Sequence, residues 1–195
     1  MESLETLYAR FPELSTPRLR LRETRPEDAP AILDILSRPE VVRFYDVGPL
    51  TRLEEAQEIV ARRARDFARH QRIRWTIARR EDDLAIGSCG VSKWTPGDPQ
   101  AEVGYELSPD HQGQGLMREA LTAVLAFGFG AMRLSRVEAL VVPENAPSRR
   151  LLARLGFQEK ELLRGRGFWR GASHDLLLLS LVAEAWNDAA GTPYE

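Results

Sequence analysis

Hydrophobic and polar positions repeat with two different periods along this chain, and each change of period predicts an element. Leu19 and Leu21 alternate with arginines, as in a half-buried strand. Residues 26–38 and 53–70 instead place their apolar side chains at helical spacing, and Pro39 ends the first of these stretches. The chain is therefore predicted to begin with one strand followed by two helices.

The middle of the chain carries three apolar stretches separated by polar turns, which predict three consecutive strands. These strands cover residues 73–78, 84–94 and 101–107. A long helical pattern at 121–132 follows them, and the β-branched residues of 136–142 predict a further strand.

The last part of the chain begins with a shorter helix from residue 146, in which Gly156 takes the C-cap position. Two strands are predicted at 157–163 and 175–182, and the glycine-rich residues 165–171 indicate a loop between them. The resulting order is β-α-α-β-β-β-α-β-α-β-β. It predicts an α/β fold in which a mixed sheet of about seven strands is flanked by helices.

Composition narrows the classes of function that such a fold could serve. Lysine plus arginine (27) nearly balance aspartate plus glutamate (29), so the net charge does not favour nucleic acid or an anionic membrane as a partner. The longest apolar run, residues 176–182, is too short to span a bilayer. At 195 residues without a linker, the chain is expected to form one domain, 1–195.

Few side chains offer thiol or metal chemistry. The single cysteine, Cys89, lies in an apolar strand of small residues and has no partner for an internal disulfide. We therefore expect a reducing compartment, a soluble cytoplasmic protein and an inert Cys89. With three histidines, one cysteine and no ligand spacing, no metal site is predicted.

Arginines cluster in the second predicted helix and just after it. They are Arg62, Arg63, Arg65, Arg69, Arg72 and Arg74. Because acidic residues interrupt the run, we interpret these arginines as the solvated face of that helix and its extension. The alternative is a landing site for an acidic substrate.

The strand at 101–107 runs into the stretch Gln112-Gly113-Gln114-Gly115, and a helix leaves that stretch. Two glycines at a strand-to-helix corner allow several main-chain N–H groups to converge where the helix dipole is positive. Such a corner is suited to binding phosphate. The alternative is that Gly113 and Gly115 only make a tight turn.

The element order and this corner resemble the GNAT superfamily of acyl-CoA-dependent N-acyltransferases, whose motif is Arg/Gln-x-x-Gly-x-Gly/Ala. Here the motif is Gln112-x-x-Gly115-x-Met117, and the larger last residue is similar to the RimJ/RimL branch. Other segments that resemble that branch are Thr16-Pro17-Arg18-Leu19-Arg20-Leu21-Arg22, Ala85-Ile86-Gly87, Glu102-Val103-Gly104-Tyr105-Glu106-Leu107, Asn145-x-x-Ser148, Leu155-Gly156-Phe157 and His174-Asp175. The resemblance runs from about residue 14 to 187, which it implies is the core of the domain. It also implies the GNAT fold, with a mostly antiparallel mixed sheet.

The resemblance also implies that acetyl-CoA is the co-substrate. The residues whose main-chain amides would hold its pyrophosphate are Gln112, Gly113, Gln114, Gly115, Leu116, Met117 and Arg118. The preceding strand would pair its backbone with the pantetheine arm along Tyr105, Leu107 and Ser108. Asn145 resembles a residue whose side-chain amide meets pantetheine, and the alternative is that it forms an Asx-turn or a helix cap.

An amine must be neutral to attack a thioester, so the reaction benefits from a base. Glu102 resembles the catalytic glutamate of some GNAT members, and Glu106 lies four residues further along the same strand. Both side chains are expected on one face, with Glu102 as the base and Glu106 as an amine anchor or second base. The alternatives are that both are ordinary surface acids, or that the base is solvent relayed through water.

The leaving thiolate needs a proton or a hydrogen-bond donor. Leu152 stands where many GNAT members place a tyrosine for this purpose, and leucine cannot serve. Ser148 resembles the serine that RimJ/RimL enzymes place near the coenzyme sulfur, and the alternative is that it caps its helix. Gly167 occupies the position of a base glutamate in one subset of that branch. Because no nucleophile has a neighbouring base, direct attack in a ternary complex is expected.

These features together predict an acetyl-CoA-dependent N-acetyltransferase. Its acceptor would be a primary amine, either a protein N-terminal amine of the ribosomal-protein type or a small amine. The alternative is a non-catalytic acyl-CoA-binding or regulatory module of the same fold. The expected partners are a coenzyme A thioester and the amine acceptor, without nucleic acid or membrane, and both a monomer and a homodimer fit the sequence.

Overall fold

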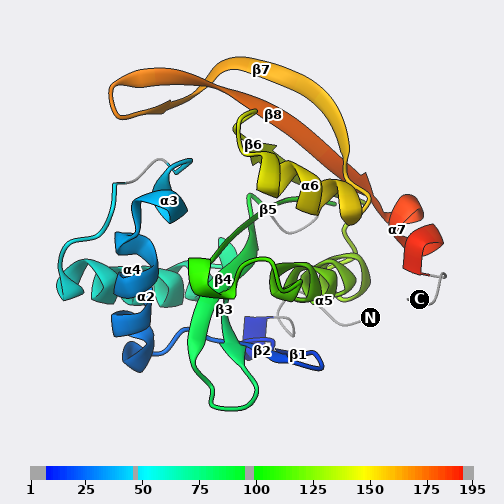
Figure 1. Cartoon of the computed structure of the whole chain (residues 1–195). Helices are drawn as coiled ribbons and strands as arrows, with labels where there is room; N and C mark the ends of the chain where they lie inside the picture. Colours follow the sequence, from blue (N-terminus) through cyan, green and yellow to red (C-terminus); the bar gives the residue numbers. More distant parts are fainter. Residues whose placement is uncertain (1–7, 46–47, 95–98, 191–195) are drawn as a thin grey trace.

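The computed structural model describes residues 8–45, 48–94 and 99–190. Its scaffold is an eight-stranded sheet in the spatial order β1-β2-β3-β4-β5-β6-β8-β7 (Figure 1). The strands are β1 (Leu14–Ser15), β2 (Leu19–Arg22), β3 (Arg72–Arg79), β4 (Ala85–Ser92), β5 (Gln100–Leu107), β6 (Arg136–Val141), β7 (Gln158–Trp169) and β8 (Ala172–Val182). All neighbouring strands pair antiparallel except β5 and β6, which confirms a mixed and mostly antiparallel sheet.

Helices follow the strands in the predicted order, and the structure adds β1, α3 and α7 to it. The helical elements are η1 (Pro26–Asp28), α2 (Ala29–Ser37), α3 (Pro39–Val42), α4 (Leu53–Ala68), η2 (Pro109–His111), α5 (Leu116–Gly130), α6 (Ala146–Arg154) and α7 (Ala183–Ala190). Among the described residues, none of these helices is long and apolar enough to cross a membrane.

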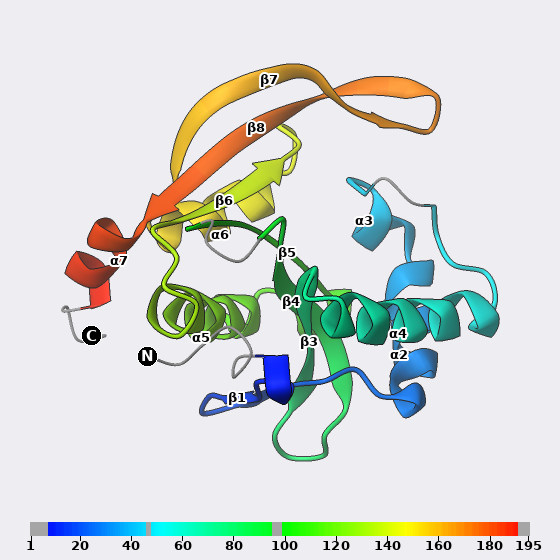
Figure 2. The ribbon, with the colours of Figure 1, turned by 180° about the vertical axis from the view of Figure 1, so that it is seen from behind.

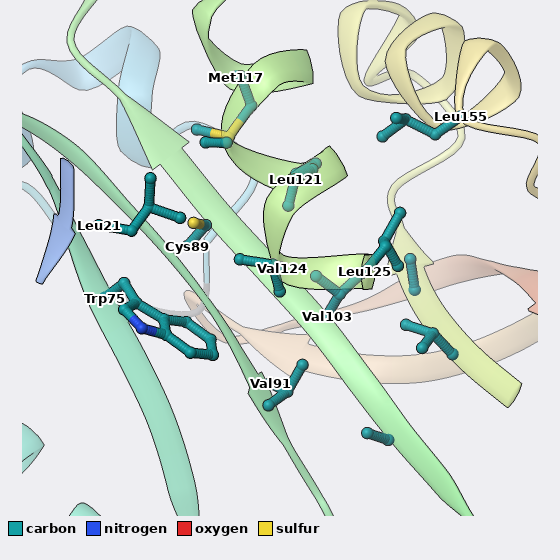
Figure 3. Close-up of a cluster of buried hydrophobic side chains, with 14 of the residues drawn as sticks. Leu21, Trp75, Cys89, Val91, Val103, Met117, Leu121, Val124, Leu125 and Leu155 are labelled. Carbon is teal, nitrogen blue, oxygen red and sulfur yellow. The ribbon is translucent and has the colours of Figure 1, made fainter. Parts of the chain in front are cut away.

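The central strands β3, β4 and β5 have one apolar and one polar face. Ile73, Val91 and Val103 lie in register across them, and all three side chains are buried. Helix α5 packs on this face, and Figure 3 shows Leu121 and Leu125 of α5 facing these strands. On the other side of β3 and β4 lie α2 and α4, as both views show (Figures 1 and 2). The sheet is therefore enclosed between two helical layers at its centre.

Strands β5 and β6 separate after a short parallel contact. Residues 100–102 of β5 pair with residues 136–138 of β6, and the pairing ends there. Towards β4, the amide of Ser108 donates to Ile86 O at 2.8 Å, directly opposite it in register. Because antiparallel strands alternate bonded and non-bonded pairs, the main-chain N–H and C=O groups of Val103, Tyr105 and Leu107 point towards β6. Residues 103–107 of β5 thus form a free edge of the sheet.

The glycine-rich residues 165–171 do not form the loop that was predicted. Strand β7 continues to Trp169 and β8 starts at Ala172, so only Arg170 and Gly171 connect them. These two residues have φ of 53° and 73°, as in the tight turns that suit the twist of a hairpin. Gly165 lies within a register shift of β7. Glycine therefore marks a turn and a bulge here, and sequence reasoning misassigned both to a loop.

Candidate active site

The glycine corner between β5 and α5 adopts a backbone that favours glycine at two positions. Gly113 and Gly115 have φ of 74° and 75°, in the left-handed region that other residues rarely adopt. A side chain added at Gly113 would meet no atom within 4 Å, so the space in front of the corner is open. The structure therefore contains the tight turn, and it also leaves room beside the turn for a ligand.

Helix α5 starts immediately after this corner and has no side-chain cap. Gly115 is its N-cap, and the first helical bond runs from the amide of Glu119 to Gly115 O at 3.0 Å. The amides of residues 116–118 come before that bond and cannot be satisfied within the helix. They lie at the positive end of the helix dipole, and this arrangement suits an anionic group.

Side chains tie the glycine corner to its surroundings. Gln112 Nε2 donates to Leu107 O at 3.1 Å, and Gln114 Nε2 donates to Asp110 O at 3.2 Å. Both glutamines therefore brace the corner itself through their side chains. The main-chain amide of Gln112 also donates within the protein, to Pro109 O at 3.2 Å, so of these two residues only Gln114 keeps a main-chain amide for a ligand.

Two residues of the β1–β2 region brace the start of α5. Arg18 Nε lies 2.6 Å from Glu119 Oε2, and Arg18 Nη1 donates to Gln114 O at 3.0 Å. Thr16 Oγ1 donates to the other carboxylate oxygen of Glu119 at 2.6 Å. Burial acts to raise the pKa of Glu119, but these hydrogen bonds outweigh it and the pKa is lowered. The Thr16-Pro17-Arg18 segment, noted in the sequence only as a resemblance, thus supports the corner.

The predicted pantetheine-binding residues lie at the free edge of β5, in two different orientations. Tyr105 and Leu107 direct their main-chain groups to the free edge, whereas the amide of Ser108 is bonded to Ile86 on β4. The carbonyl of Tyr105 accepts a hydrogen bond from Tyr45 Oη at 2.8 Å. The carbonyl of Leu107 accepts from Gln112. What the free edge offers to a ligand is therefore mainly amide donors.

A pair of hydroxyl groups spans the space between β5 and α6. Tyr105 Oη lies 2.6 Å from Ser148 Oγ. The amide of Ser148 donates to Asn145 Oδ1 at 3.2 Å, so Asn145 is the N-cap of α6 and the cap alternative for this residue is present. The side chain of Ser148 does not cap the helix. Burial raises the pKa of Tyr105 to about 12.

Glu106 is buried on the polar face of the sheet, with 8% of its surface exposed. Its Oε1 accepts from Arg63 Nη2 at 3.1 Å and from Ser88 Oγ, and its Oε2 accepts from Tyr45 Oη at 3.0 Å and from Arg74. Burial alone would raise the pKa of Glu106, but the two guanidinium groups outweigh it and the pKa is lowered. A carboxylate held in this way is a weak base, and its oxygens face arginines, so we assign Glu106 no role towards the acceptor amine.

Two arginines from the predicted solvated run are buried in this cluster. The side chains of Arg63 and Arg74 are 11% and 16% exposed, whereas Arg65 is half exposed and pairs with Glu58. The interpretation as a solvated face was therefore wrong for Arg63 and Arg74. Gly90 and Gly104 lie opposite Arg74 on the neighbouring strands, and a side chain on Gly104 would come within 3.3 Å of Arg74 Nη1. These glycines make room for the arginine, which is the signal that the sequence offered.

Glu102 lies on the same face of β5 as Glu106 but in different surroundings. The register places it opposite Ser92, and Glu106 opposite Ser88, which confirms the expected common face. The side chain of Glu102 is 26% exposed, and Glu102 Oε2 lies 2.7 Å from Lys93 Nζ. Glu102 is the last residue of β5 that pairs with β6. It is thus a partly exposed carboxylate at the point where the free edge begins.

Sequence reasoning missed Tyr45 and the side-chain role of Tyr105. Tyr45 comes from the segment after α3 and donates both to Tyr105 O and to Glu106. Burial and the Glu106 carboxylate raise its pKa well above the ordinary value. The predicted inertness of Cys89 agrees with its surroundings, because burial raises the pKa of its thiol to about 12. For Tyr105, the alternation of side chains along a strand places its ring on the same face as Val103. This alternation was the sequence signal for where the Tyr105 side chain lies.

The tip of the β7–β8 hairpin comes close to the end of α3. Arg170 Nη2 donates to Val42 O at 3.0 Å, although the two residues are 128 positions apart. The hairpin tip lies on the same side of the molecule as α3 in both views (Figures 1 and 2). Near the tip, the rings of Trp169 and His174 stack with centroids 3.9 Å apart. The tip of the hairpin and the end of α3 are thus in direct contact.

Comparison with known proteins places these features among acetyltransferases. Residues 18–158 match the family model for the acetyltransferase (GNAT) domain. The chain is 36% identical over 172 residues to the uncharacterized N-acetyltransferase YoaA of Bacillus subtilis, which covers 88% of this chain and 97% of that protein. It is 38% identical over 88 residues, 43% of each chain, to the ribosomal protein uS5-alanine N-acetyltransferase of Escherichia coli. The structure of Mycobacterium smegmatis RimJ in complex with CoA-disulfide superposes with a TM-score of 0.78 at 27% identity, over 89% of each chain.

Proposed function

This chain belongs to the GNAT acetyltransferase family, and from that premise we propose that it transfers the acetyl group of acetyl-CoA to a primary amine. The observation that carries the proposal is the continuity of three features. The free edge of β5 runs into the glycine corner, and the corner opens onto the uncapped start of α5. An extended chain ending in a phosphate fits these features in that order.

The donor half of the reaction would be bound mainly by the main chain. The amides of residues 113–118 would hold the pyrophosphate of acetyl-CoA, since that of Gln112 donates to Pro109 O, and the edge amides of Tyr105 and Leu107 would pair with the pantetheine arm. The open space at Gly113 supports this fit. A main-chain N–H of the same edge is also a suitable donor to the thioester carbonyl, because it is held in place before the substrate arrives.

The acceptor half needs a neutral amine. An α-amino group has a pKa of about 7.7–8.0 and a lysine of about 10.4, so an α-amine loses its proton far more easily near neutral pH. Glu102 is our candidate base, alone or through water, because it is a partly exposed carboxylate on β5 itself, at the point where the free edge begins. We propose a protein N-terminal amine or a small amine as the acceptor. The similarity to the enzyme that acts on uS5 alanine supports the first of these.

Direct attack by the amine is the proposed mechanism. The C–N bond forms as the C–S bond breaks, the electron pair of that bond goes to sulfur, and the proton of the attacking amine goes to the base. Cys89 is buried on the apolar face of the sheet, which disfavours an acyl-cysteine intermediate. A ternary complex of enzyme, acetyl-CoA and amine therefore precedes the chemical step.

Release of free coenzyme A thiol on addition of amines tests the proposal. The panel would contain peptides with a free or blocked N-terminus, each with or without lysine, together with polyamines, amino acids and aminoglycosides. We expect turnover with at least one free amine and none with its blocked counterpart. Firm acetyl-CoA binding without turnover on any acceptor would contradict the proposal and would favour the non-catalytic module.

A variant at the corner tests the donor site separately. Gly115→Val forces a β-branched residue into a left-handed backbone, at φ of 75°. We expect this change to cost more in the free energy of acetyl-CoA binding, measured by calorimetry, than in the free energy of unfolding, followed through the melting temperature. Leu53→Val is a matched control, since it also places valine at the start of a helix, but on α4. Unchanged coenzyme affinity in Gly115→Val would place the pyrophosphate elsewhere.

A further inference from the structure

Tyr105 and Ser148 form a hydroxyl pair that neither the helix cap nor the core packing explains. Tyr105 belongs to β5 and Ser148 to the first turn of α6, 43 residues later, and their oxygens are 2.6 Å apart. The main-chain N–H of Tyr105 points to the free edge of β5. An extended ligand that lies along this edge therefore passes close to the hydroxyl groups of Tyr105 and Ser148.

The two hydroxyl groups differ in acidity, and this sets the direction of the hydrogen bond. The geometry allows either hydroxyl to donate, and because a phenol is a stronger donor and a weaker acceptor than an alcohol, we assign Tyr105 as the donor and Ser148 Oγ as the acceptor. Burial raises the pKa of Tyr105 to about 12, so the phenol keeps its proton at every pH at which the protein would be assayed. The hydroxyl hydrogen of Ser148 is then free to point to a third group.

The backbone of Ser148 is fixed independently of its side chain. Asn145 Oδ1 accepts from the amide of Ser148 at 3.2 Å, which holds the first turn of α6. Leu152, one turn further along α6, is fully buried and offers no hydroxyl to the same space. The hydroxyl that α6 presents to the space next to Tyr105 is therefore that of Ser148.

We propose that Tyr105 is a positioning residue that orients the Ser148 hydroxyl towards the sulfur of the leaving coenzyme A thiolate. This inference rests on the proposed function, because it assigns the sulfur to the space beside the pair. As the C–S bond breaks and its electron pair goes to sulfur, Ser148 donates a hydrogen bond to the developing thiolate. The thiolate takes its proton from water, and Tyr105 and Ser148 keep theirs.

A double-mutant cycle tests this coupling during turnover. We expect Ser148→Ala to lower kcat about tenfold and Tyr105→Phe about fivefold, with little change in KM for acetyl-CoA. If Tyr105 acts through Ser148, the double variant is no slower than Ser148→Ala alone. A double variant whose loss equals the product of the two single losses would overturn the proposal.

Tyr45→Phe is the matched control for this cycle. It also removes a phenol that contacts Tyr105, but the contact is to the carbonyl of that residue, and Tyr45 donates to Glu106 as well. Its effect on kcat is expected to multiply with that of Ser148→Ala. Coupling of Tyr45 to Ser148 as strong as that of Tyr105 would mean that the cycle reports a general disturbance of β5, and would also count against the proposal.

A binding experiment tests the inference without an acceptor. Coenzyme A and desulfo-coenzyme A differ only at the sulfur, and thiols ionise at alkaline pH, a cysteine side chain with a pKa of about 8.5. For the wild type, we expect the affinity of coenzyme A relative to desulfo-coenzyme A to rise between pH 7 and 9.5, because the bound thiolate is hydrogen-bonded. Tyr105→Phe and Ser148→Ala are expected to lose most of this rise, and an unchanged rise in both would overturn the inference. Absence of turnover in the wild type would count against the proposed function alone.

Discussion

The two faces of strands β3, β4 and β5 are built from alternating residues of the same segments, yet different forces hold them. On the face under α5, Trp75 and Cys89 lie in register and are fully buried among apolar side chains (Figure 3). On the face under α4, Arg74 and Glu106 are buried as charges, together with Arg63. Burial stabilises the first face through the area removed from water, and the second only while its charges remain paired.

The difference decides how each face responds to change. Removing one apolar side chain costs its transfer free energy plus a term for the cavity that is left behind. Removing one partner of a buried charge cluster leaves the other charges without compensation, which costs more. The polar face is also the one that touches the free edge of β5, through the hydrogen bond from Tyr45 to Tyr105 O. The polar face therefore connects the stability of the sheet with the candidate active site.

The largest expected effect comes from breaking the charge cluster. Glu106→Gln leaves Arg63 and Arg74 buried without a counter-ion, and we expect the free energy of unfolding to fall by about 3–5 kcal/mol. Denaturant unfolding measures this loss. Adding Arg63→Met should restore part of the stability, because it removes one of the uncompensated charges. A loss below about 1 kcal/mol would contradict the description of the cluster as a buried ionised network.

Removing a side chain from the apolar face should lower the free energy of unfolding somewhat less. Leu121 of α5 is 1% exposed, and Leu121→Ala is expected to lower the free energy of unfolding by about 3 kcal/mol. Because Leu121 and Glu106 lie on opposite sides of the sheet, the two losses should add within about 0.5 kcal/mol. A strongly non-additive double variant would show that the two faces are not energetically separate.

Acid should affect the polar face selectively. The pKa of Glu106 is lowered from its ordinary value of 4.5, so the unfolded chain binds this proton more readily than the folded one. The contribution of Glu106 to stability is therefore present above about pH 4.5 and is lost as the pH falls through its folded pKa. Unfolding measured from pH 7 to pH 3 should give parallel curves for the wild type and Leu121→Ala. The curve of Glu106→Gln should be flatter, and a parallel curve for it would contradict the assignment.

The smallest effect on stability is expected at the other end of the polar face. Glu102→Gln removes a partly exposed ion pair with Lys93, so we expect a loss of at most about 1 kcal/mol. Turnover at neutral pH should instead fall by about tenfold or more, with less effect near pH 9, where an α-amine is already neutral. Steady-state thiol release at both pH values measures this. Unchanged turnover would move the base to another group or to solvent.

Local features of the fold were predictable from the sequence. The strand that runs into Gly113 and Gly115, the start of a helix after them and the helix end at Gly156 all follow from the residues within one turn. In the structure, Gly156 has φ of 91° and the amide of Phe157 donates to Leu152 O at 3.0 Å, as a glycine cap requires. The common face of Glu102 and Glu106 likewise follows from the period of a strand.

The identity of the buried arginines was not predictable in the same way. Arg63 and Arg65 are two residues apart on α4, and both fit a solvated face by composition. Only the packing of α4 over the sheet places Arg63 against Ser88 and Glu106 and leaves Arg65 in solvent. Similarly, Gly165 lies in a bulge of β7 and Gly171 in the turn after it because β8 pairs with β7, which the glycines alone do not indicate.

The order of the main elements and the glycine corner were thus predictable from the residues alone, because backbone conformation and hydrophobic period are set by residues close together in the chain. The tertiary structure decided the contacts within the site. Tyr45 meets Tyr105 across 60 residues, and Tyr105 meets Ser148 across 43. Such contacts depend on sheet register and on where β5 and β6 separate, and these are properties of the whole fold.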